Sequence, residues 1–239
     1  MYGRFVALSS IKVLHVRLEG LTASFRHPLV ISGTQVSTPM PAYSNLLGMM
    51  SACAGRIVAP SETRIGFEFH CLSHDVELER TVRWQLDKQR RLRPHSKGQG
   101  ISYRQVYWGP RLDLYVTNLD LRIAFEKPAA TPCFGRSQDI AWIKWVREVD
   151  LRPVKTGAVG PTLIPYPQEG IPGLAVRLPE WFDNTAVGQP RRSGPFGHYH
   201  AMPPIVRDLR FQVEREDLFH PLDSERDDDA IYLHRWLTG

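Results

Sequence analysis

IKVLHVRLE (Ile11 to Glu19) and PAYSNLLGMMSACAG (Pro41 to Gly55) are the two stretches that decide how this chain begins to fold. In the first, apolar and polar residues alternate, which predicts a half-buried strand. In the second, apolar residues recur at helical spacing from Leu46, and Pro41 suits a first helical turn. Gly55 supplies a C-terminal stop. A strand followed by a helix therefore opens the fold.

The segments that follow extend this pattern. Gly66 to Leu72 and Leu112 to Val116 predict two further strands, and Cys133 to Leu151 predicts a turn leading into a fourth. Asn118 to Glu126 alternates like a strand, but Asn118 also suits a helix cap, and we favour the helix. The resulting order predicts an α+β fold, a ferredoxin-like or RRM-like antiparallel sheet with helices on one face.

A basic, aromatic arm separates the second and third of these strands. From Arg83 to Arg111 there are eight basic residues and one acid; subtracting this +7 from the chain's +5 leaves −2 elsewhere. The cations are Arg83, Lys88, Arg90, Arg91, Arg93, Lys97, Arg104 and Arg111, and the aromatics are Trp84, Tyr103, Tyr107 and Trp108. Aromatic faces among cations are what binding of single-stranded nucleic acid requires. The alternative is a solvated loop that only keeps the protein soluble.

The arm is too long for a structureless loop in a compact domain, so we expect a β-hairpin thumb at about residues 74–110. Residues 153–204 are rich in Pro and Gly, which indicates an irregular wrap or a small subdomain. We therefore expect an RRM-like domain over residues 1–151 and a Pro/Gly-rich C-terminal extension over 152–239.

The composition argues against a membrane protein, a secreted protein and a zinc-binding protein. The chain has 239 residues, 42% of them hydrophobic, without a run approaching the ~18 apolar residues of a membrane span and without a signal-peptide pattern. We expect a cytoplasmic protein that does not bind membranes. Cys53, Cys71 and Cys133 are too widely spaced for a zinc site, which favours reduced thiols and neither a metal nor a cofactor.

Three blocks of the sequence resemble a known family. They are VLHVRLEGLTASFRHP (residues 13–28), STPMPAYSNLLGMMSACAG (residues 37–55) and FGRSQDIAWI (residues 134–143). Together with the basic arm, which lies between them, they resemble the Cas-five family, the type I CRISPR Cascade subunit that caps the 5′ handle of the guide RNA. The resemblance covers about residues 10–151, and the Pro-rich approach to the first helix is similar to the non-cleaving branches, subtype I-B among them.

The resemblance implies an RRM-like fold and a thumb that contacts guide RNA and the adjacent Cascade backbone subunit. It also implies a Cascade large subunit as a partner and leaves a contact with target DNA open. By likeness, RNA faces the loop and helix start near Arg26 and Ser44 and the turn at Arg136; a helix N-terminus suits a phosphate. The expected RNA-binding residues are Arg26, His27, Ser44, Asn45, Arg83, Lys88, Arg90, Arg91, Arg93, Lys97, Tyr103, Arg104, Tyr107, Trp108, Arg136 and Ser137.

The alternative to a role in guide-RNA binding alone is catalysis. One branch of the family is a metal-independent endoribonuclease that processes CRISPR repeat RNA with a Tyr and an adjacent Lys-His pair. Tyr43 lies in a suggestive place, but the sequence contains no Lys-His dipeptide. His198 and His200 would share one face of a strand without an identifiable third metal ligand. We expect a non-catalytic subunit; a generic RRM-like RNA-binding protein fits the charge pattern but not the sequence blocks.

Overall fold

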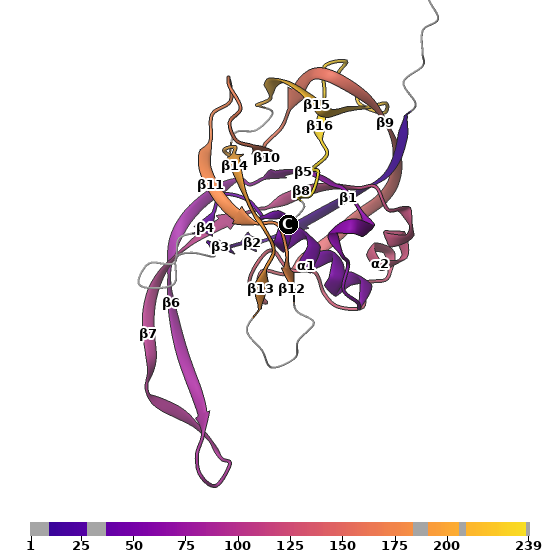
Figure 1. The fold of residues 1–239 in the computed structure, drawn as a ribbon. Helices are drawn as coiled ribbons and strands as arrows, with labels where there is room; N and C mark the ends of the chain where they lie inside the picture. Colours follow the sequence, from indigo (N-terminus) through magenta and orange to yellow (C-terminus); the bar gives the residue numbers. More distant parts are fainter. Residues whose placement is uncertain (1–9, 28–36, 184–190, 206–208, 238–239) are drawn as a thin grey trace, which may run out of the picture.

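Figure 1 shows the computed structural model, which describes residues 10–27, 37–183, 191–205 and 209–237. Its main element is a six-stranded sheet in the order β16-β15-β9-β1-β8-β5, antiparallel at every pairing. The strands are β1 (Ile11–Gly20), β5 (Ile65–His70), β8 (Arg111–Val116), β9 (Ala141–Val159), β15 (Phe211–Pro221) and β16 (Ile231–Tyr232). The prediction of an α+β fold built on an antiparallel sheet is confirmed.

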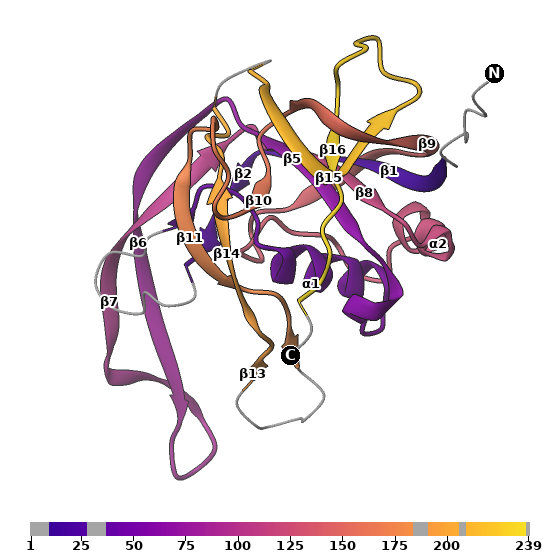
Figure 2. The same cartoon turned by 45° about the horizontal axis from the view of Figure 1, so that its top comes forward.

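The two helices lie together on one side of this sheet (Figure 2). They are α1 (Tyr43–Ala54) and α2 (Arg122–Glu126), with short 3₁₀ turns η1 (Pro60–Glu62) and η2 (Leu119–Leu121). Helix α1 ends at Gly55, whose φ of +65° is the left-handed conformation that glycine adopts freely. The Asn118 side chain accepts a hydrogen bond from the Asp120 amide at 3.0 Å, which confirms the helical interpretation of this segment.

Alternation along β1 divides its side chains between two environments. Leu14, Val16 and Leu18 are buried and share the main core cluster with Leu46 and Met50 of α1. The residues between them therefore face the side of the sheet that α1 does not cover.

The C-terminal part of the chain continues the same sheet. Strand β9 runs without interruption through residue 151, and β15 pairs with its second half. After β16, the His234 amide donates to the Ile65 carbonyl at 2.8 Å, which ties the chain to β5 at the opposite edge. Residues before and after position 151 therefore belong to one sheet.

The Pro/Gly-rich segment also contains regular structure. A second sheet has the order β10-β14-β11, formed by β10 (Leu163–Pro165), β14 (Phe196–Ala201) and β11 (Leu174–Pro179). A short ribbon joins β12 (Phe182–Asp183) to β13 (Arg192–Ser193). Regular strands therefore occupy part of the segment for which the sequence predicted an irregular wrap or a small subdomain.

The basic arm is a long hairpin that projects from the body of the protein (Figure 1). Strands β6 (Ser73–Leu86) and β7 (Leu92–Trp108) pair along their length, and β2 (Thr22–Ala23) adds a third strand at the base. Beside the base, β3 (Phe25–Arg26) pairs with β4 (Ser37–Thr38). The predicted hairpin is confirmed, and we call it the thumb.

No helix among the described residues is long and apolar enough to cross a bilayer.

Candidate nucleic-acid interface

The tip of the thumb is a turn held together by one acid. The Asp87 carboxylate accepts hydrogen bonds from the amides of Gln89 (2.9 Å) and Arg91 (2.8 Å) and from the Arg93 guanidinium (3.0 Å). Arg90 adopts a φ of +58°, which is uncommon for a residue other than glycine. The Asp87 hydrogen bonds stabilise a turn that places Arg90 at the apex.

The cations of the thumb differ in how far they are neutralised. Asp87 forms ion pairs with Arg93 and, at 3.7 Å, with Arg91. Among the described residues, Arg83, Lys88 and Arg90 are exposed and form no ion pair. Lys97 lies on β7, but its side chain is outside the described part of the structure. Arg83, Lys88 and Arg90 are thus the described thumb cations best placed to meet phosphates.

One face of the thumb is apolar and exposed. Directly opposed residues of paired strands share a face, and Leu78 faces Tyr103, Trp84 faces Pro94 and Leu86 faces Leu92. Leu78, Tyr103 and Trp84 are each more than half exposed. The exposed apolar and aromatic residues of this face are Val76, Leu78, Val82, Trp84, Leu86, Leu92, Ile101 and Tyr103. Sequence reasoning missed this strip because it counted charges, although the period-two alternation from Val76 to Leu86 carries the signal.

An ion-pair network fixes the base of the thumb to the body. Arg104 of β7 donates to Glu79 of β6 at 2.7 Å and is only 7% exposed. Arg136, in the turn before β9, pairs with Glu77 of β6 and makes a two-pronged contact of 2.8 and 2.9 Å with the fully buried Asp139. Its hydrogen bonds to Asp139 and Glu77 raise the pKa of Arg136. Carboxylates therefore hold the guanidinium groups of both Arg104 and Arg136, two of the expected RNA-binding residues, and fix them at the base of the thumb.

The turn that carries Arg136 explains the block FGRSQDIAWI. Phe134 is buried, with its ring centroid 6.3 Å from that of Phe69 and 6.5 Å from that of Phe25. Gly135 has a φ of +106°, and a Cβ there would lie 2.1 Å from the Ser24 carbonyl oxygen. This close approach requires glycine. The block's conformation therefore serves to hold the thumb base.

The remaining expected RNA-binding residues lie in different surroundings. Arg26 is exposed on β3 and His27, next to it, is half-buried, whereas Ser137 lies in the turn that holds the thumb base. Ser44 is half-buried in the first turn of α1.

The last three expected RNA-binding residues are Asn45, Tyr107 and Trp108, and their side chains have different contacts. Asn45 uses its side-chain oxygen to accept a hydrogen bond from the Ala42 amide at 3.0 Å. Tyr107, expected to face RNA, is buried in the core cluster, with its ring 6.3 Å from that of Phe69. Trp108 is 45% exposed at the thumb base and remains available.

The residues considered for catalysis are Tyr43 and the pair His198 and His200. Tyr43 is fully buried, and its hydroxyl donates to the Leu163 carbonyl at 2.8 Å. Burial raises the pKa of Tyr43 well above its usual value. His198 and His200 do lie on one strand, β14. No group of three or more metal-binding side chains occurs within the described residues.

Comparison with solved structures gives the fold a context. No protein-family model and no curated protein sequence matches the chain. A chain of a CRISPR RNA-guided surveillance complex aligns with 86% of this chain and 91% of its own length, with 14% sequence identity and a TM-score of 0.51. A CRISPR protein from Archaeoglobus fulgidus aligns with 95% of this chain and all of its own, at 12% identity and a TM-score of 0.48. The fold is therefore similar to that of the chain from the surveillance complex.

Proposed function

We propose that this chain is a Cas-five-like, non-catalytic subunit that caps the 5′ handle of guide RNA in a type I Cascade complex. Strands β1, β5, β8 and β9, with α1 after β1 and α2 after β8, follow the chain order of a ferredoxin-like unit. Fold alone does not give function. The proposal therefore depends on the thumb.

The observation that carries the proposal is the division of the thumb into an apolar face and a basic tip. Exposed apolar side chains at this density are typical of protein contacts, and the backbone and large subunits are the partners that the proposal assigns. Unpaired cations at the tip suit the phosphates of a single strand. A thumb of this kind can contact a neighbouring subunit and guide RNA at the same time.

The surroundings of Tyr43 support a non-catalytic role. A general base must reach the proton it removes, whereas the Tyr43 hydroxyl is buried and bound to a backbone carbonyl. Repeat RNA incubated with the protein in chelator at neutral pH should remain intact, and Tyr43→Phe should leave RNA binding unchanged. Site-specific cleavage that disappears in this variant would contradict the assignment.

Separate variants of the two thumb surfaces test the proposal. Leu78→Ser with Trp84→Ala should reduce co-purification with the backbone subunit while the salt dependence of RNA binding stays the same. Alanine at Arg83, Lys88 and Arg90 should have the opposite effect. If both sets of variants leave co-purification and RNA binding at wild-type levels, the thumb is not the interface.

A further inference from the structure

A row of polar and aromatic side chains crosses the sheet face that α1 leaves uncovered, close to the base of the thumb. In the strand register, Trp142 of β9 lies opposite Glu19 of β1, Glu19 lies opposite Arg111 of β8, and Arg111 lies opposite His70 of β5. Opposed residues share a face. Four adjacent strands therefore contribute one side chain each to the same row.

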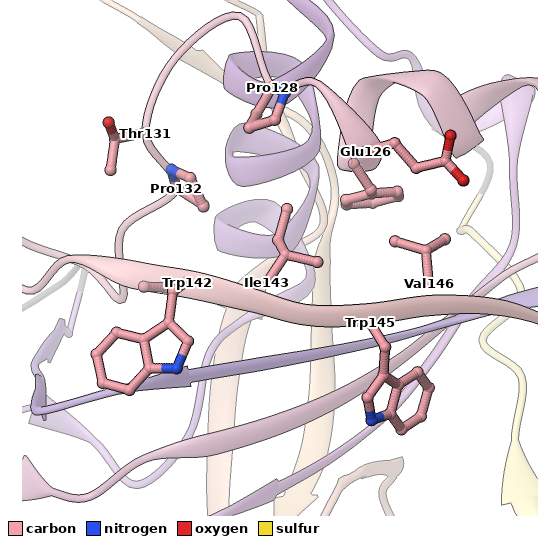
Figure 3. Close-up of a pocket in the computed structure, with 10 residues that line it drawn as sticks. Glu126, Pro128, Thr131, Pro132, Trp142, Ile143, Trp145 and Val146 are labelled. Atoms are coloured by element: carbon pink, nitrogen blue, oxygen red, sulfur yellow. The ribbon is translucent and has the colours of Figure 1, made fainter.

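This row lines an open pocket of about 390 Å³. Cys71, Leu72 and the turn at Gly109 and Pro110 complete its lining. Figure 3, a close-up of another pocket beside β9, shows Trp142 leaving β9 on the side opposite to Ile143. Trp142 is 41% exposed and Leu72 is 58% exposed, so two apolar walls of the pocket remain accessible. The volume lies near the lower end of ligand pockets, about 300–1,000 Å³, and suits one nucleoside.

Two polar side chains of the row, Arg111 and Glu19, offer opposite hydrogen-bonding groups to a ligand. Arg111 can only donate. It forms an ion pair with Asp113 Oδ2 at 3.4 Å, and its buried Nε has no hydrogen-bond partner among the described residues. Glu19 can only accept, and its carboxylate is partly exposed, with Lys144 Nζ at 3.6 Å. The pocket therefore presents a donor group and an acceptor group beside an indole ring.

We propose that this pocket binds one unstacked guanine base of single-stranded RNA, with RNA as the ligand resting on the proposed function. Guanine carries acceptors at O6 and N7, which arginine recognises, and donors at N1 and N2, which a carboxylate accepts. Trp142 supplies a stacking surface for the base. Adenine has an amino group in place of O6, so it would set a donor against Arg111.

The next row along the sheet provides a path for the strand. The guanidinium groups of Arg17 and Arg147 lie 4.9 and 4.5 Å from the Trp145 ring. Arg17 is held by Asp113 at 2.8 Å, and Arg147 is half-exposed beside Asp223 at 3.0 Å. A base in the pocket would place its flanking phosphates near these arginines and Lys144.

The test uses the full chain and labelled hexauridine in which one central residue is uridine, guanosine or adenosine. Wild-type protein should bind the guanosine RNA about tenfold more tightly than the adenosine RNA in fluorescence anisotropy. Glu19→Ala should reduce this preference, and alanine at both Glu19 and Arg111 should remove it. Trp142→Ala should weaken binding of the guanosine RNA about tenfold, whereas Trp142→Phe should retain most of it.

Leu222→Ala, at a half-exposed leucine away from the pocket, serves as the control and should bind as wild type does. Melting temperatures verify that each variant is folded. Equal binding of the three RNAs by wild type, or a guanosine preference that survives alanine at both Glu19 and Arg111, overturns the inference. If thumb variants impair RNA binding while the pocket variants change nothing, the pocket inference fails and the proposed function stands.

Discussion

Removing the three unpaired thumb cations should change how strongly salt weakens RNA binding. The perturbation is the triple substitution of alanine for Arg83, Lys88 and Arg90. All three are exposed at the distal end of the thumb without an ion pair among the described residues. Arg91 and Arg93 are left in place because Asp87 already pairs with both. The substitution therefore removes the positive charge with the least compensation.

The magnitude follows from counterion release. Each phosphate neutralised on a single strand contributes about −0.7 to the slope of log K against log salt, so three lost contacts change the slope by about 2. Between 50 and 200 mM salt, a fourfold change in concentration, wild-type binding should weaken about 20-fold more than binding by the variant.

The assay is RNA-binding affinity measured by anisotropy at several salt concentrations, with guide RNA carrying an intact 5′ handle. A variant with alanine at Lys127, Arg152 and Lys155 is the matched control, because these exposed residues form no ion pair among the described residues and lie outside the thumb. It loses the same charge and should keep the wild-type slope. Equal slopes for the thumb variant and the wild type, or an equal loss in the control, would refute the reasoning.

Three further predictions concern the thumb and the sheet. Within the thumb, trypsin should cut the free protein only in the turn Asp87–Arg91, because β6 and β7 are paired on both sides of it; cleavage within β7 would show that the hairpin is open. Arg136→Ala should lower the free energy of unfolding by about 3 kcal/mol, because it leaves Asp139 buried and unpaired. Adding Asp139→Ala should restore part of this loss in denaturant titrations. Burial opposes ionisation of Asp113, but hydrogen bonds from His15 and Arg17 lower its pKa to about 2, so its stabilising contribution is present above pH 4 and is lost as the pH falls toward 2. Asp113→Asn should flatten this acid dependence, and an unchanged profile would contradict the assignment.

The regular elements of the first half of the chain were predictable because each has a local cause. The alternation in β1, the glycine stop of α1 and the Asn118 cap are signals that a few neighbouring residues carry. The thumb followed from its length and charge. The pairing of β15 with β9 could not be predicted, since nothing within residues 211–221 specifies a partner strand so far away in the sequence.

The candidate site was predictable in part. Composition identified the thumb as basic, but it could not show that Arg104 and Arg136 are held by carboxylates, because their partners Glu79 and Asp139 are set by tertiary packing. Tyr107 reads as a surface aromatic in sequence and is buried in the fold. The row from Trp142 to His70 depends on the register of four strands, which no local pattern contains.

The most direct test of the central claim is reconstitution with the backbone subunit and guide RNAs in chelator. One guide has an intact 5′ handle and the other has the handle deleted. The chain should be retained in the purified complex about one to one with the intact guide, should be lost with the deleted guide, and should leave both RNAs uncut. Equal retention with both guides, or specific cleavage of repeat RNA by the chain alone, would contradict the proposal that it caps the handle without catalysis.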